Sequence, residues 1–114
     1  MEKQAQFTNK KTLFDKNTDL PELPGVYKFF NSENEIIYIG KAKNIKNRVK
    51  SYLSVRKGEG KRIAKLKSSI KFIETIITKT ESDALILEQG LISKKRPPFN
   101  IQFRDDKSYP AIHL

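Results

Sequence analysis

Glu88 is an acidic residue in a stretch of chain that is otherwise rich in apolar residues. On a helical wheel at about 100° per residue, it lies within roughly 25° of the centre of an apolar face. The members of that face are Ala84, Leu85, Leu87, Leu91 and Ile92. A carboxylate buried there costs several kcal/mol unless a cation compensates it. Two interpretations follow: an ion pair with a Lys or Arg residue, or a site for a metal ion or catalysis.

Two basic side chains have positions that favour a phosphate. Arg48 lies toward the edge of the apolar stripe of an expected helix, where its guanidinium could clamp a phosphate. A solvated position on the flank of that Lys-rich helix is the alternative. Lys41 follows Gly40 at a strand-to-helix junction, a place that favours an anion. Other lysines nearby are expected to form a general electrostatic surface: Lys43, Lys46 and Lys50.

Two tyrosines and one asparagine complete the set of candidate site residues. Tyr27 and Tyr38 lie in two expected strands, where a tyrosine is most often a core residue with a solvated hydroxyl. A turn at residues 31–34 would place Tyr27 opposite Tyr38, with both hydroxyls on one face, and a one-residue slip would separate them. Asn100 follows two prolines and either binds a phosphate or caps a turn.

The composition narrows the classes of function. The 114 residues include 23 Lys plus Arg against 13 Asp plus Glu, a net charge of +10 that favours a polyanionic partner such as nucleic acid. The absence of cysteine excludes disulfides and thiolate sites, and a single His113 makes a zinc cage implausible. The longest apolar runs have four residues, far below the ~20 that span a bilayer. With no apolar signal region at the N-terminus, we expect a soluble, cytoplasmic protein.

Hydrophobic periodicity predicts a small α+β domain, in which helices pack on a three-stranded sheet in the order ββααβα. Residues 1–20 are expected to form a loose polar arm, residues 21–104 the folded domain, and residues 105–114 a tail or linker. Thr80 begins a capping pattern for the last long helix. The expected elements are strands at 25–30, 35–40 and 71–79, helices from 44 to 53, at 61–69 and from 80 to about 95, and a short extended segment at 99–103.

Two triplets carry a resemblance to a known family. Gly25-Val26-Tyr27 and Tyr38-Ile39-Gly40 closely resemble the signature of the GIY-YIG nuclease superfamily, with Val in place of the first Ile. Further segments occur in the same order as in the UvrC-type domains of that superfamily, over about residues 21–110. They are 23–27, 38–44, 47–49, 81–91, 96–97 and 105–110.

The resemblance implies a metal-dependent DNA endonuclease, making the 3′-side incision of nucleotide excision repair with one divalent ion, Mg²⁺ or Mn²⁺. Glu88 matches the metal ligand of the family. The other matching catalytic positions are Tyr27, Tyr38, Lys41, Arg48 and Asn100. Either tyrosine could help to activate the nucleophilic water. The expected partners are DNA, to which the protein localises when acting in the nucleoid, and a UvrB-like repair protein if the chain is part of a longer protein.

The surface expected to grip the DNA backbone is basic and independent of sequence. Its members are Lys41, Lys43, Lys46, Arg48, Lys50, Arg56, Lys57, Lys61 and Arg62. Two alternatives remain: a basic nucleic-acid-binding or repair-adaptor module without catalysis, and a stand-alone endonuclease acting on branched DNA.

Overall fold

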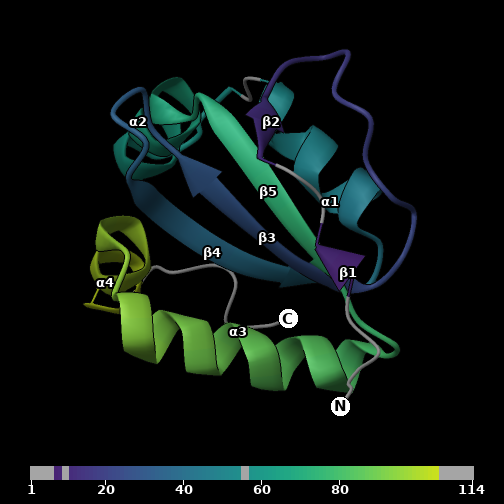
Figure 1. Cartoon of the computed structure of the whole chain (residues 1–114). Coiled ribbons are helices and arrows are strands. Elements are labelled where there is room, and N and C mark those ends of the chain that lie inside the picture. Colours follow the sequence, from purple (N-terminus) through teal and green to yellow (C-terminus); the bar gives the residue numbers. More distant parts are fainter. Residues whose placement is uncertain (1–6, 9–10, 55–56, 106–114) are drawn as a thin grey trace.

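An antiparallel sheet with helices on both faces forms the molecule (Figure 1). The structure is a computed structural model that describes residues 7–8, 11–54 and 57–105. Its strands are β1 (Phe7–Thr8), β2 (Thr12–Leu13), β3 (Gly25–Phe30), β4 (Ile36–Ala42) and β5 (Phe72–Ile77). Its helices are α1 (Ile45–Lys50), the 3₁₀ turn η1 (Ser51–Leu53), α2 (Lys61–Ser69), α3 (Glu81–Lys95) and α4 (Pro98–Asp105). The strand order is β1-β5-β3-β4, with β2 also paired to β5, so β4 lies at one edge of the described sheet.

Each face of the sheet has its own core. The α+β class and the central three strands were predicted correctly, because alternate residues of β3 and β4 point to opposite faces. Tyr27 and Phe29 pack on one face with Ile45 and Val49 of α1. The opposite face is covered by α3, whose members in that core are Ala84 and Ile92, packed with Val26 and Ile39 of the sheet.

The hairpin of β3 and β4 has a register two residues away from the predicted one. Tyr27 pairs with Gly40, and Phe29 pairs with Tyr38, so Tyr27 is not opposite Tyr38. An irregularity between Phe29 and Phe30 and a longer turn cause the shift. In that turn Asn34 adopts a left-handed φ of 67°. Because the shift is an even number of residues, the prediction that both tyrosines share a face still holds.

Capping side chains start the two helices that carry candidate residues. Asn44 caps α1 by accepting a hydrogen bond from the backbone N–H of Asn47. Thr80 caps α3 by accepting one from Asp83, as its sequence pattern predicted. At the far end of α3, Arg96 adopts a left-handed conformation, and Pro97-Pro98 follows.

The prediction of a loose N-terminal arm is wrong for residues 11–20. Thr12 and Leu13 form β2 against β5, and Leu20 is buried in the core. Scattered apolar residues gave no periodicity, but β5 offers them an open edge to pair with. The folded part therefore begins before residue 21, and residues 1–6 and 9–10 of the arm lie outside the described residues.

The predicted extended segment at 99–103 is also wrong, because these residues belong to α4. Pro98 occupies the start of the helix, where its missing N–H costs nothing and its fixed φ suits helical geometry. The prolines therefore end α3 as predicted and also begin the next helix. No helix in the described ranges has the length and apolar character needed to span a membrane.

Candidate active site

Tyr27 of β3 is buried, and its side chain extends over the neighbouring edge strand β4. Its exposed fraction is 1%, and its ring lies over Gly40, the residue with which it pairs. A Cβ atom added to Gly40 would lie 2.4 Å from the Tyr27 hydroxyl oxygen and 2.5 Å from the ring carbon that bears it. No side chain fits in that gap. The second glycine of the motif is thus required so that the first tyrosine can extend over β4.

The Tyr27 hydroxyl belongs to a polar cluster with the half-buried Tyr52 and the exposed Arg48. Its oxygen lies 3.2 Å from the Tyr52 hydroxyl oxygen. Burial raises the pKa of Tyr27 well above its ordinary value, the neighbouring Tyr52 raises it further, and Arg48 opposes the rise. In return, the charge interaction with Tyr27 raises the pKa of Arg48 above its already high value, partly offset by burial. Tyr27 is therefore a neutral phenol, and Arg48 is a fixed cation beside it.

Tyr38 joins the same cluster through its ring. The ring centroids of Tyr38 and Tyr27 are 6.3 Å apart, and those of Tyr38 and Tyr52 are 6.4 Å apart. Phe29 packs against the same rings, with its ring centroid 4.9 Å from that of Tyr52 in an edge-to-face arrangement. Arg48 also interacts electrostatically with Tyr38. The structure thus brings together three of the predicted residues, Tyr27, Tyr38 and Arg48.

Asn100 is engaged with the backbone of β4. Its side-chain oxygen accepts a hydrogen bond from the Ile39 N–H at 2.8 Å, and its side-chain nitrogen donates one to the Ile39 carbonyl at 2.9 Å. Asn100 is 7% exposed. Of the two alternatives from sequence, neither phosphate binding nor a turn cap describes these bonds. Asn100 instead satisfies an edge strand that has no further neighbour in the described sheet.

Glu88 is half-buried, so the expectation of a largely desolvated carboxylate is wrong. The buried side of α3 runs through Ala84 and Ile92, whereas Leu85 is 44% exposed and does not contribute to it. Glu88 lies one helical turn from both Ala84 and Ile92 and keeps part of its surface exposed. Gln89 donates a hydrogen bond to Glu88 Oε1 at 3.0 Å. Among the described residues, no Lys or Arg pairs with Glu88, which disfavours the ion-pair interpretation.

The structure places Glu88 and Lys41 on the side of the sheet opposite the tyrosines. Lys41 pairs with Val26, which packs under α3, and its Nζ lies 3.2 Å from Glu81 at the start of α3. Lys41 belongs to β4, and α3, the helix that carries Glu88, packs against that strand. The described residues contain no group of three or more His, Cys, Asp or Glu suited to a metal. A metal here would therefore depend on a single carboxylate.

Besides Lys41 and Arg48, the predicted DNA-binding residues differ in exposure and pairing. Four lysines are exposed: Lys43, Lys50, Lys57 and Lys61. Lys46 pairs with Glu22 at 3.6 Å, and Arg62 donates to the Gln102 carbonyl at 3.4 Å. Arg56 lies outside the described residues.

Comparison with known proteins identifies the fold. The family model of the UvrC-like GIY-YIG domain matches residues 23–101 of the sequence. This chain belongs to that family. The UvrC-like domain is 48% identical over 103 residues to UvrABC system protein C of Helicobacter hepaticus, covering 84% of this chain and 17% of the relative. It is 53% identical over 96 residues to UvrABC system protein C of Acinetobacter baumannii, covering 84% of this chain and 16% of that relative. The chain thus spans about one sixth of the length of these curated relatives.

A solved structure matches the UvrC-like domain as well. The GIY-YIG N-terminal endonuclease domain of UvrC from Thermotoga maritima, bound to its catalytic magnesium, has a TM-score of 0.62 and 41% identity. The match covers 70% of this chain and 85% of the other. Structures of variants of that domain, one with asparagine replaced by alanine and three with a tyrosine replaced by phenylalanine, are also bound to the catalytic divalent cation.

Sequence reasoning missed Tyr52. Its position in the expected helix from 44 to 53 fits the apolar stripe, seven residues after Ile45, and a tyrosine there is typical of a packing residue. In the structure it lies in η1, beyond the end of α1, and its hydroxyl reaches Tyr27. The available signal was its position four residues after Arg48 in the chain, which places a second polar group beside the guanidinium.

Proposed function

We propose that this UvrC-like domain hydrolyses DNA phosphodiesters with one divalent cation held by Glu88, making the 3′-side incision of nucleotide excision repair. The observation that carries the proposal is the Arg48 guanidinium held against the buried hydroxyl of Tyr27 beside an edge strand. This position holds the guanidinium beside the edge of the sheet, where it suits a phosphate clamp.

Glu88 suits a magnesium or manganese ion. Its side chain is half-buried and has no cationic partner among the described residues. Magnesium keeps several waters and tolerates a single carboxylate ligand, whereas zinc requires three or four protein ligands. The Thermotoga maritima variants lacking a tyrosine hydroxyl or an asparagine amide still hold their cation. This supports a carboxylate, rather than a phenol or an amide, as the protein ligand. When bound, the metal supplies Lewis-acid stabilisation of the leaving oxygen.

Arg48 stabilises the charge that develops on the phosphoryl oxygens. Tyr27 and Tyr52 fix its guanidinium before substrate arrives, so no reorganisation is needed in the transition state. The proposed role of Tyr27 is that of a donor and positioning group. Its raised pKa makes it unsuitable as a general base near neutral pH.

Tyr38 is the proposed group that helps to activate the water. It shares the face of Tyr27 and interacts with the Arg48 charge, so it lies beside the proposed phosphate clamp. Lys41 is proposed to neutralise phosphate charge from the α3 side. To do so it would leave its exposed ion pair with Glu81, which costs little.

The scissile phosphate is proposed to lie along the edge of β4. Lys41 belongs to β4 and lies on the face covered by α3, the helix that carries Glu88, and Tyr27 extends over Gly40 on the other face. Only the edge of the strand is within reach of both sets. Asn100 keeps that edge closed to another strand by bonding to Ile39, and it is proposed as a positioning residue.

The exposed lysines of this chain are proposed to hold the DNA backbone. Such contacts carry no base specificity, so the choice of damaged DNA falls to partners such as a UvrB-like protein. Neutralising one of them, Lys57→Gln, should lower the slope of log affinity against log salt by about one. Replacement of Lys46, which pairs with Glu22, should lower it less.

Glu88→Gln tests the proposed chemistry. We expect this variant to lose metal-dependent nicking of damaged DNA in the presence of the partner proteins, while its DNA affinity stays at or slightly above the wild-type value. Glu33→Gln, the same change at an exposed position in the hairpin turn, is the control and should nick normally. Wild-type nicking by Glu88→Gln would reject the proposal.

A non-catalytic adaptor is the alternative that the charge favours, since a net charge of +10 alone can bind DNA. It predicts strong salt-dependent binding and no metal-dependent nicking in any variant. A stand-alone endonuclease would instead nick branched DNA without partner proteins, so a comparison of substrates separates the two.

A further inference from the structure

Residues 11–20 precede the part of the chain that the family model matches and nevertheless pack on the candidate site. Their backbone is fixed by β2, which pairs with β5, and by a hydrogen bond from the Phe14 N–H to the Lys71 carbonyl at 2.9 Å. Thr18 closes the following turn by donating its hydroxyl to the Leu13 carbonyl at 2.8 Å. This segment presents Phe14 to the core, while Leu13 beside it is 50% exposed.

Ring contacts connect Phe14 to the polar cluster. The centroids of Phe14 and Phe29 are 5.4 Å apart, and Phe29 contacts Tyr52 at 4.9 Å and Tyr27 at 5.2 Å. The hydroxyls of Tyr52 and Tyr27 then meet at 3.2 Å. Every step is a direct packing or hydrogen-bond contact. The position of Tyr52 therefore depends on Phe14, through Phe29, although Phe14 does not contact the hydroxyls of the polar cluster.

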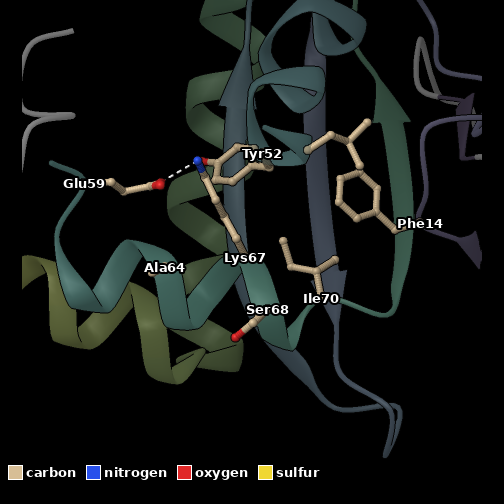
Figure 2. Close-up of a pocket in the computed structure, with 8 residues that line it drawn as sticks. Phe14, Tyr52, Glu59, Ala64, Lys67, Ser68 and Ile70 are labelled. Atoms are coloured by element: carbon tan, nitrogen blue, oxygen red, sulfur yellow. Dashed lines mark ion pairs between the residues drawn. The ribbon is translucent and has the colours of Figure 1, made fainter. Parts of the chain in front are cut away.

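A cavity of about 290 Å³ lies beside this path, and both Phe14 and Tyr52 line it (Figure 2). Its other walls come from η1, from α2 and from the residues that flank α2, and include Leu53, Ala64 and Ile70. The cavity leaves space into which Tyr52 can move if the wall formed by Phe14 is lost.

The polar groups around the cavity already have partners. Lys67 pairs with Glu59 and donates to the Ser54 carbonyl at 2.7 Å. Ser68 donates to the Lys65 carbonyl at 3.0 Å. No buried polar group among these is left for a ligand, so the cavity is better explained as packing space than as a binding site.

We propose that Phe14 is a positioning residue that holds Tyr52 against Tyr27, and through them the Arg48 guanidinium, so that the N-terminal segment is part of the catalytic structure. This inference rests on the proposed nuclease function for its consequence in rate. Its structural content does not, because Tyr27 and Tyr52 can be observed without substrate.

The test compares Phe14→Ala with Leu13→Ala, the neighbouring exposed position, and with Phe14→Leu as the conservative variant. Tyrosine labelled at the ring carbon that bears the hydroxyl gives the pKa of each tyrosine by NMR in the folded, metal-free chain. We expect the pKa of Tyr27 to fall toward ~10 in Phe14→Ala as water enters. It should fall less in Phe14→Leu and remain at the wild-type value in Leu13→Ala. If Phe14→Ala does not fold, Phe14→Leu carries the comparison.

Nicking of damaged DNA, with the partner proteins present, gives the second readout. We expect kcat to fall about tenfold in Phe14→Ala with KM unchanged, because a small displacement of a catalytic group lowers the rate without removing a DNA contact. A folded Phe14 variant with the Tyr27 pKa of wild type would overturn the inference. If wild type does not nick, the proposed function fails, and the tyrosine pKa values still decide the role of Phe14.

Discussion

Gly40 and Tyr27 face each other across the β3–β4 pair, and the phenol of Tyr27 occupies the space where any other residue would carry its Cβ atom. The two motif triplets are therefore a single packing unit: the glycine of one strand makes room for the tyrosine of the other. Because the neighbouring atoms are those of a fully buried ring, they cannot simply swing away.

Gly40→Ala should therefore displace Tyr27. We expect a loss of about 2 kcal/mol in the free energy of unfolding, as is usual for overpacking. We also expect a loss of about a hundredfold in nicking rate, since the Arg48 support moves with the ring. Urea unfolding and a nicking assay measure the two effects.

Gly90→Ala is the matched control, because a Cβ atom added there meets nothing within 4 Å. Gly90 lies inside α3, where alanine is favoured by about 1 kcal/mol. This variant should be slightly more stable than wild type and nick normally. Equal effects of the two substitutions would contradict the importance of the Gly40–Tyr27 contact.

The buried phenol of Tyr27 should make stability depend on pH in the alkaline range. Its pKa is raised in the folded state, so the folded state favours the protonated form more than the unfolded state does. The resulting stability is present in full below about pH 10, the ordinary pKa of tyrosine, and is lost as the pH rises from there through the folded pKa.

Tyr27→Phe removes the titrating group and should lose less stability than wild type between pH 9 and about 11. Urea unfolding of both proteins across this range measures the difference. Parallel curves for the two proteins would show that Tyr27 titrates normally and is not buried as described.

The Lys67–Glu59 pair should stabilise the region between η1 and α2. Its side chains are only 12% and 8% exposed, so removal of one partner leaves the other charge poorly solvated. We expect Lys67→Met to cost about 3 kcal/mol. The double variant Lys67→Met/Glu59→Leu should recover part of that loss.

The exposed pair of Lys46 and Glu22, with side chains 40% and 66% exposed, provides the comparison. Lys46→Met should cost about 0.5 kcal/mol or less. If the two lysine variants were equally stable in chemical denaturation, the buried pair would have no special role in holding the region.

Much of the fold and part of the site follow from local sequence. Alternation in Gly25–Phe30 and the cap at Thr80 act within a few residues, so the pattern predicted the strand and the start of α3 correctly. The pairing of Thr12–Leu13 with β5 joins residues about 60 positions apart and leaves no local trace. The predicted register of the hairpin was wrong because the register depends on a turn in which Asn34 adopts a left-handed conformation.

The site residues divide in the same way. Arg48 and Tyr27 were found because a charge near an apolar stripe and a tyrosine in a glycine motif are locally unusual. Glu88 was predicted to be more buried than it is. The helical wheel counted Leu85 among the core residues of α3, whereas Leu85 is 44% exposed in the structure. The role of Asn100 could not be predicted, since its partner Ile39 is 61 residues away.

The direct test of the account is the location of a divalent cation in crystals of this domain soaked in Mn²⁺. The anomalous difference map should contain a peak within bonding distance of the Glu88 carboxylate in wild type, and that peak should vanish in Glu88→Gln. A Glu88 carboxylate bonded to a lysine or arginine instead, with no manganese peak beside it, would contradict the account.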